Sequence, residues 1–433
     1  MKTCFCPADI MLPKKGIDLK KWSVVACDQY TSQPEYWDEV ERFVKDAPST
    51  LRLTYPEIYL GETYDRMSEI HRNMDRYIKE GLLEEAVHHG FVLTVRTTES
   101  GKRIGLVGNV DLESYDFHPE KKTMIRATEK TVEERIPPRM KVRKEAIIEL
   151  PHVMLLVDDL KGRLIEALYE RRDAFRNVYE TELMMGGGHI AGYAIEGEDA
   201  VNLQQLIQKM EEERGGLFLV TGDGNHSLAT AKACWENMKR ELVHKFIADK
   251  GYASESELEE EDRAELEELL AANRSRYALV EVVNLHSEAL VFEPIHRLLT
   301  CVGEKDVEAD FEKYMQEKGI AVTEGTDLIF IQGGTGIGIT FGIDNHRLPV
   351  DLLQEFLDDY VKRFPQMTID YIHGEETIRE LSENAGNCGM ILGEFRKEQM
   401  FDAIETGGVL PRKTFSVGHA NEKRYYMESR MII

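Results

Sequence analysis

The segment at residues 217–240, LFLVTGDGNHSLATAKACWENMKR, constrains the fold of this chain more than any other stretch. Residues 217–221 have the apolar, β-branched character of a buried strand. A polar turn follows, and apolar residues then recur at spacings of three and four, which predicts a helix that packs on a core. These residues are Leu228, Ala231, Trp235, Met238 and Leu242. A strand that turns sharply into a helix is typical of mixed α/β folds, and we expect that class here.

The turn itself consists of polar and small residues, Asp223, Gly224, Asn225, His226 and Ser227. Glycine allows a tight change of direction and a close approach of the backbone. The first amides of a helix lack internal acceptors, and the helix dipole adds positive charge, so this place favours a phosphate. A plain helix cap would explain Asp223 and Asn225, but it leaves His226 and Ser227 without a purpose. On local chemistry, a cap and an anion site both remain open.

Length, charge and cysteine spacing narrow the class of protein. A chain of 433 residues exceeds one ordinary hydrophobic core, so we expect two lobes. The net charge of −25 disfavours nucleic acids and anionic membranes as partners, although a local positive pocket for a small anion is compatible with it. No apolar run approaches a membrane span or a secretory signal, and the six cysteines show no zinc spacing. We therefore expect a cytoplasmic protein with a small-molecule partner.

The pattern of predicted elements changes towards the C-terminus. After residue 307, helices and strands alternate, and no flexible linker marks the change. We place a boundary near residue 300, which gives a phosphate-binding region at residues 1–300 and a C-terminal α/β region at residues 301–433.

Four separated motifs resemble, in order, those of a bacterial family of unknown function, domain-of-unknown-function family 1015. GDGNHSLATA is similar to the family's D-G-H-H-R-x-x-T-A signature. IRATEKTVEER is similar to its His-Glu-x-Thr segment, with Thr128 in place of His and with Glu129 and Thr131 matching. EPIHRLL, which contains His296 and Arg297, and GGVLPRKTF, which resembles G-x-x-M-P-x-K-S/T, complete the series. The resemblance extends over nearly the whole chain.

The signature also resembles one in the ParB/sulfiredoxin superfamily, whose members include an archaeal free-serine kinase, sulfiredoxin and ParB-type CTPases. In that superfamily a strand–turn–helix element holds nucleotide phosphates. The resemblance implies such an element embedded in a larger two-lobed body, ATP or ADP with Mg²⁺ as cofactors, and residues 223–227 facing the phosphates. Asn225 departs from the pattern by replacing the first His, and Ser227 replaces the Arg that pairs with phosphate. Without that bidentate cation, another cation has to substitute.

The candidate substitutes lie elsewhere in the sequence. Arg126, Arg135 and Arg139 belong to the densest basic stretch, and they either offset neighbouring glutamates at the surface or neutralise a phosphate. Lys413, in the last motif, either reaches an anion or lies in a surface turn.

Two carboxylates are candidates for a general base. Glu129 is the first choice and Asp28, which follows a strand in VVACDQY, is the second. Either residue can instead hold Mg²⁺ or make an ordinary turn or ion pair. By the resemblance, His226 and Thr131 are expected beside the phosphates, with His226 as a further catalytic candidate.

Three functions remain open on these grounds. The first is a nucleotide-dependent kinase for a small hydroxyl metabolite, with free serine as the leading substrate. The second is a nucleotide-gated switch module of ParB-like type, and the third is a protein that binds a metabolite phosphate without catalysis or nucleotide. Substrate, metal and oligomeric state are left open.

Overall fold

The computed structural model describes residues 3–59, 65–342 and 347–432, which form two compact units. Unit 1 comprises Met1–Ala127, Thr131–Ala289 and His419–Ile433, and unit 2 comprises Thr128–Lys130 and Leu290–Gly418. The C-terminal segment therefore belongs to unit 1. The division into regions 1–300 and 301–433 stays a prediction about where independently folding parts separate.

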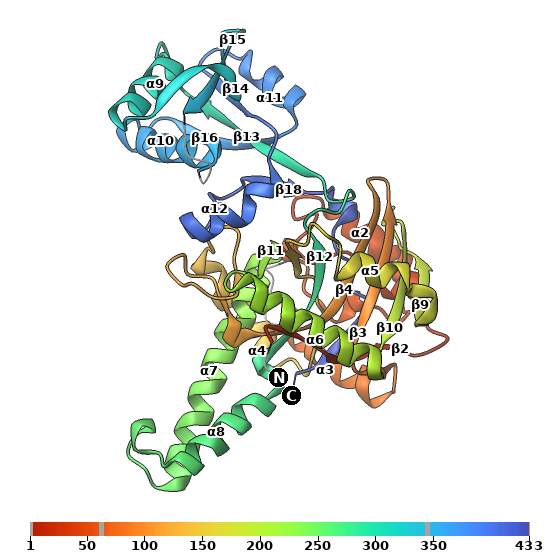
Figure 1. Ribbon diagram of the computed structural model, residues 1–433. Coiled ribbons are helices and arrows are strands. Elements are labelled where there is room, and N and C mark those ends of the chain that lie inside the picture. The colour runs from red at the N-terminus through yellow and green to blue at the C-terminus, as the bar shows by residue number, and fades with distance from the viewer. Residues whose placement is uncertain (1–2, 60–64, 343–346, 433) are drawn as a thin grey trace. The chain divides into compact units, whose positions relative to one another are not determined.

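A mixed, eleven-stranded sheet forms the centre of unit 1 (Figure 1). Its main path runs β5-β6-β11-β8-β12-β4-β3-β10-β9, with β1 paired to β4 and β2 paired to β3. Strands β5, β6 and β11 run parallel to one another, as do β8 and β12, and the remaining pairs are antiparallel. The strands are β1 Phe5–Cys6, β2 Ala8–Pro13, β3 Leu83–Thr98, β4 Gly101–Asp111, β5 Tyr115–Asp116, β6 Ile125–Arg126, β8 Met154–Val157, β9 Arg176–Glu182, β10 His189–Ile195, β11 Leu219–Asp223 and β12 Tyr277–Asn284. The expected mixed α/β class is confirmed.

Helices cover both faces of this sheet, because alternate residues of its strands point to opposite sides. In β3, Phe91 and Leu93 share a hydrophobic cluster with Leu203 of α6, whereas Val92 packs in a second cluster with Trp37 of α2. Each cluster is one side of the core. The helices are α1 Leu19–Trp22, α2 Pro34–Val44, α3 Asp65–Lys79, α4 Ile136–Lys144, α5 Ile165–Glu170, α6 Gly197–Arg214, α7 Asn225–Lys250 and α8 Glu260–Ala272.

Helix α7 begins on the sheet and extends beyond it. Leu228, Ala231 and Trp235 are buried in the core, but Met238 is 37% exposed. Figure 1 shows the far half of α7 projecting from the sheet with α8 beside it. The predicted apolar stripe is therefore correct over the first turns and wrong at Met238, whereas Leu242, one turn further on, is partly buried against the core.

The C-terminal segment closes unit 1 by pairing with segments from the first part of the chain. Tyr425 forms an antiparallel bridge with Val25, and β19 (Arg430–Met431) pairs with β7 (Ile148–Glu149). These long-range pairings place the residues just before β19 against the start of β8. In the described ranges, no helix combines the length and apolar character needed to cross a bilayer.

Unit 2 is built on an antiparallel sheet in the order β15-β14-β17-β13-β16, with β18 paired to β13. Phe330 of β14 packs against Phe311 of α9, and its neighbour Ile331 joins the cluster of Ile378 in α11, so helices cover both faces. The elements are β13 Phe292–Thr300, α9 Val307–Glu317, β14 Ala321–Gln332, β15 Thr335–Gly342, α10 Pro349–Arg363, β16 Thr368–His373, α11 Glu375–Ser382, β17 Cys388–Leu392, α12 Met400–Gly407 and β18 Phe415–Val417.

The turn between β11 and α7 depends on Gly224. Its φ is 80° and its ψ 26°, a left-handed conformation that glycine adopts without the penalty of a Cβ. A Cβ here would lie 3.0 Å from Cα of Val153, whose carbonyl accepts the amide proton of Glu281 in β12. Because that backbone is held in the sheet, it cannot move away easily.

We therefore expect Gly224→Ala to lower the free energy of unfolding by about 2 kcal/mol or more, from backbone strain plus a steric clash. Gly251→Ala is the matched control, because Gly251 has a φ of 82° but no atom within 4 Å of the position that an alanine Cβ would take. It should cost only about 1 kcal/mol. Urea unfolding followed by tryptophan fluorescence reports on unit 1, where Trp22, Trp37 and Trp235 all lie. Equal losses in the two variants would contradict the steric argument.

Candidate functional site

The first turn of α7 lies against the start of β8, because β11 and β8 are antiparallel neighbours. Asp223 at the end of β11 pairs with Met154 at the beginning of β8. This register places Ser227 beside His152, which stands two residues before β8. The Oγ atom of Ser227 lies 2.8 Å from Nε2 of His152. The turn identified in the sequence is thus completed by a histidine from a different strand.

A chain of hydrogen bonds links Cys27, Tyr426, His152 and Ser227. The buried hydroxyl of Tyr426 accepts the amide proton of Cys27 at 3.1 Å and lies 2.9 Å from Nδ1 of His152. It also makes a side-chain hydrogen bond with Cys27, which adds to the effect of burial in raising the pKa of Tyr426. Whichever atom donates in the contact between Oγ of Ser227 and Nε2 of His152, the Ser227 hydroxyl keeps the capacity for a further hydrogen bond to a ligand.

Charged side chains surround this hydrogen-bonded chain. Oδ2 of Asp28 lies 4.0 Å from Nε2 of His152, and Nζ of Lys423 lies 3.1 Å from Oδ2 of Asp223. Burial acts to raise the pKa of Asp28, but His152, a hydrogen bond from Gln29 and the charge of Lys423 lower it overall. Asp28 is therefore a carboxylate at neutral pH.

His226 is held as a neutral hydrogen-bond donor. Its Nε2 accepts the amide proton of Val132 at 3.3 Å. Burial, and then the charges of Arg139 and Arg135, lower the pKa of His226 to about 4. At neutral pH the ring is uncharged and its one proton is on Nδ1. Within the described part of the chain, Nδ1 has no hydrogen-bond partner, so this proton is available to a ligand.

The other polar groups of the turn bond to neighbouring residues. Oδ1 of Asp223 accepts the amide proton of Gly224 at 2.9 Å, and the Asn225 side-chain oxygen accepts from the hydroxyl of Thr221. The amide of Ser227 donates to the carbonyl of Gly224 at 3.0 Å and is not available to an anion. Helix α7 begins after Gly224 without a side-chain cap, and Asp223 and Asn225 bond to neighbouring residues instead. The groups of the turn that remain for a ligand are the His226 ring and the Ser227 hydroxyl.

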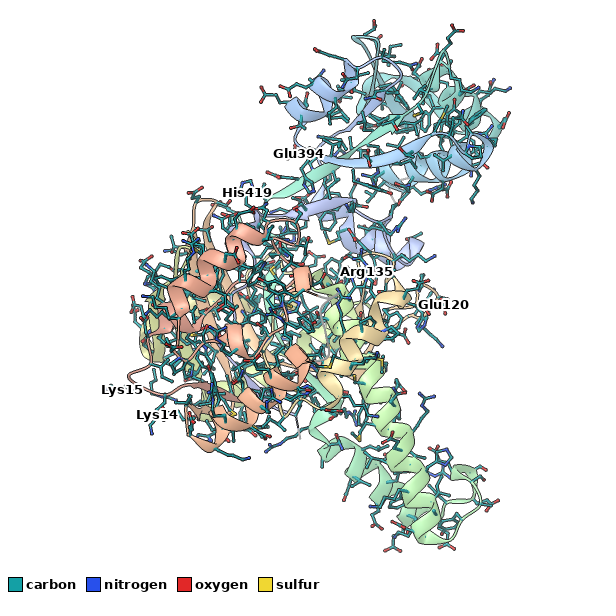
Figure 2. All side chains as sticks on the ribbon, turned by 180° about the vertical axis from the view of Figure 1, so that it is seen from behind. Lys14, Lys15, Glu120, Arg135, Glu394 and His419 are labelled. Atoms are coloured by element: carbon teal, nitrogen blue, oxygen red, sulfur yellow. The ribbon has the colours of Figure 1, made fainter. Side chains whose placement is uncertain are left out.

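The three arginines expected to replace the missing phosphate-binding Arg lie in three different environments. The guanidinium of Arg139 forms an ion pair with Glu57, and Arg126 is buried on β6. Arg135 is exposed directly before α4 (Figure 2), and its charge reaches the site through its effect on His226. The cation that lies beside the turn is Lys423, which no sequence motif singled out.

Three further predicted residues lie apart from these contacts. Thr131 is buried, and its Oγ1 has no hydrogen-bond partner among the described residues. Glu129 and Lys413 belong to unit 2, where both adjoin Arg297. Burial lowers the pKa of Arg297 to about 10, with Tyr371 and Glu129 acting in the opposite direction. Arg297 also donates to the carbonyl of Lys413 at 3.1 Å. Glu129 and Lys413 are thus brought together within unit 2.

Sequence reasoning missed His152, Tyr426 and Lys423. A weak signal exists for His152, because it stands beside Pro151 immediately before an entirely apolar strand, where a polar residue is uncommon. Tyr426 and Lys423 lie in a terminal stretch without periodicity. Their position depends on pairing with Val24–Ala26, which local sequence does not encode.

Two carboxylates, Asp28 and Asp223, and one cation, Lys423, have the charges that binding of a nucleotide with Mg²⁺ requires. Among the described residues, no group of three or more His, Cys, Asp or Glu side chains is arranged to hold a metal ion. Mg²⁺ bound through phosphates needs only one or two protein carboxylates, and Asp28 and Asp223 supply two near Lys423. Lys423 and the two neutral donors can meet phosphate oxygens.

Comparison with protein families matches residues 11–397 to the family described as "Protein of unknown function (DUF1015)". The chain belongs to this family. The family assignment made from the four motifs is confirmed. Comparison with the curated proteins finds none that matches the chain.

Several solved structures resemble this DUF1015 protein at low identity. A free serine kinase variant in complex with ADP has a TM-score of 0.37 and 10% identity, over 78% of this chain and 95% of that chain. A conserved hypothetical protein from Pyrococcus furiosus has a TM-score of 0.31 and 12% identity, over 74% of this chain and 90% of that chain. SbnI from Staphylococcus aureus, truncated at its C-terminus, has a TM-score of 0.34 and 9% identity, over 72% and 82%. The ParB/sulfiredoxin-like element stays a prediction.

The environment of His226 predicts a pH dependence of stability. The pKa of about 4 in the folded protein lies below the value of 6.5 for a free histidine, so the unfolded chain binds more protons between these values. The stabilising contribution is complete above pH 6.5 and is lost as the pH falls towards 4. After allowance for solvent screening, the loss is about 1 to 2 kcal/mol.

The matched variant is His226→Gln, whose amide oxygen can still accept from Val132 but does not titrate. Between pH 7 and pH 4, the free energy of unfolding should fall further for the unsubstituted protein than for this variant. Urea titrations at several pH values measure the difference. Parallel curves for the two proteins would show that His226 titrates normally.

Proposed function

We propose that the start of α7 in unit 1 is a phosphotransferase site, which uses a nucleotide to phosphorylate a small hydroxyl compound. The observation that supports this most directly is the set of groups around Ser227. Two uncharged donors, Ser227 and His226, stand with one cation, Lys423, and a carboxylate, Asp28, at a helix N-terminus. Phosphoryl transfer requires positioning and neutralisation of phosphate charge more than covalent catalysis, and these groups provide both.

In the proposed reaction, the bound nucleotide with Mg²⁺ supplies its terminal phosphoryl group. The bond from phosphorus to the bridging oxygen breaks as a bond to the acceptor oxygen forms, and the acceptor hydroxyl loses its proton. Lys423 offsets negative charge on the phosphate oxygens, and the Nδ1–H of His226 hydrogen-bonds to them. Asp28, a carboxylate, orients the acceptor hydroxyl and takes its proton.

Glu129, the first choice from the sequence, is the other candidate for the general base. It lies in unit 2 with Arg297, so Asp28 and Glu129 are tested separately by Asp28→Asn and Glu129→Gln. The residue that acts as base should lose most of the turnover when substituted, with nucleotide affinity retained. Rapid-quench measurement of a single turnover compares the two.

The central test is incubation of the full chain with ATP or ADP, Mg²⁺ and a panel of hydroxyl compounds that includes free serine. We expect a phosphorylated acceptor and the corresponding nucleotide product, detected by phosphorus NMR. Nucleotide binding without transfer to any acceptor would favour the ParB-like switch. Stabilisation by inorganic phosphate but by no nucleotide would favour a non-catalytic phosphate-binding protein.

A second prediction concerns the cation. Lys423→Gln should weaken nucleotide binding by at least ten-fold, about 1.4 kcal/mol, because Asp28 and Asp223 then repel the phosphates without an opposing charge. Lys250→Gln is the matched control, since Lys250 is also ion-paired, with Asp262 and Glu265, but lies at the other end of α7. Isothermal titration calorimetry compares the two variants. Equal affinities would remove Lys423 from the site.

A further inference from the structure

A cavity of about 180 Å³ in unit 1 lies against the first turns of α7. It lies where the two hydrophobic clusters of the core meet, and its walls are mainly apolar. Side chains that line it include Leu53, Met74, Ile148, Leu228, Ala231 and Leu279. Ser227, His152 and Tyr426 line the same cavity, so its wall includes the hydrogen-bonded chain described above.

The charged groups in the cavity wall neutralise each other. Arg139 is paired with Glu57, and Arg143 lies 2.6 Å from Oε2 of Glu149. Each glutamate in the wall thus forms an ion pair with an arginine, and a charged ligand would find no unpaired counter-charge among these four residues. Placing a zwitterion in such a space would cost the hydration of both its charges.

The polar wall still offers one defined hydrogen bond. The contact with His152 uses one hydrogen-bonding position of Ser227, so its hydroxyl can form a further hydrogen bond with the hydroxyl group of an uncharged ligand, which both donates and accepts. The dimensions suit a small ring, since an apolar cavity of about 150 Å³ is enough for benzene in a protein core. The wall therefore matches a molecule with one hydroxyl on an apolar body.

We propose that this cavity binds the acceptor of the site: an uncharged hydroxyl compound whose apolar part, of about six to eight carbons, fills the space between Met74 and Ala231. Its hydroxyl lies at the Ser227 end of the cavity. The transfer of a phosphoryl group to that hydroxyl rests on the proposed function, but binding does not. The inference replaces free serine by an apolar alcohol as the substrate class.

Benzyl alcohol is the probe, with toluene as its hydroxyl-free analogue and L-serine as the polar alternative. The full chain is labelled with methyl-¹³C methionine, and Met74→Leu assigns the resonance of Met74. Benzyl alcohol should shift the Met74 methyl signal at millimolar concentration, toluene should shift it more weakly, and L-serine should leave it unchanged. Met315, which is buried in unit 2, is the internal control and should not respond.

A cavity-filling variant tests the location. Ala231→Leu places three more carbon atoms in the space and should abolish the response of Met74 to benzyl alcohol. The control Ala248→Leu makes the same substitution at an exposed position of the same helix and should leave the response intact. Retained binding in Ala231→Leu would overturn the assignment of the cavity. If Ala231→Leu fails to fold, Ala278→Val, which alters the part of the wall formed by β12, gives the same comparison.

Addition of ATP and Mg²⁺ separates the two proposals. Benzyl phosphate formed by the unsubstituted chain supports both. Benzyl alcohol that binds at Met74 without being phosphorylated, when no other alcohol is phosphorylated either, supports the cavity and contradicts the phosphotransferase. Phosphorylation of L-serine together with an unresponsive Met74 signal overturns the apolar acceptor and leaves the phosphotransferase standing.

Discussion

The buried ion pairs of Arg424 anchor the segment on which the candidate site depends. Its guanidinium is bound by Glu281 of β12 and by Glu428, and all three side chains are buried. Removal of one partner from such a group leaves an uncompensated buried charge, at a cost of about 3 to 5 kcal/mol. Arg424 stands between Lys423 and Tyr426 in the sequence, so this anchor fixes the cation beside Asp223 and the phenol beside His152.

The site is an arrangement of hydrogen-bonding groups rather than a cluster of strong charges. Tyr426 lies at hydrogen-bond distance from Nδ1 of His152, and Nε2 of His152 lies at hydrogen-bond distance from Ser227. The amide of Val132 donates to Nε2 of His226, which leaves the proton on Nδ1 of His226 to face a ligand. Groups held in this way cost little reorganisation when a charged group binds.

Local and overall charge have different consequences in this protein. The net charge of −25 repels polyanions at long range, whereas Lys423 acts over a few ångströms on whatever lies at the turn. The neighbouring cavity favours an uncharged ligand, because its charged side chains are paired with one another and its walls are mainly apolar. A phosphate donor and an apolar acceptor would therefore be selected by different physical terms at adjoining surfaces.

The sequence by itself determined the strand, turn and helix around Gly224, the mixed α/β class and the family. These follow from residue spacing, glycine conformation and short motifs, which act within a few residues. Only the tertiary structure decided that Glu57 forms an ion pair with Arg139, that Lys423 is the cation at the turn, and that His152 and Tyr426 lie in one hydrogen-bonded chain with Ser227. The antiparallel register of β8 with β11 and the return of the C-terminal segment bring these groups together. Such pairings join residues far apart in the chain, and no local pattern encodes them.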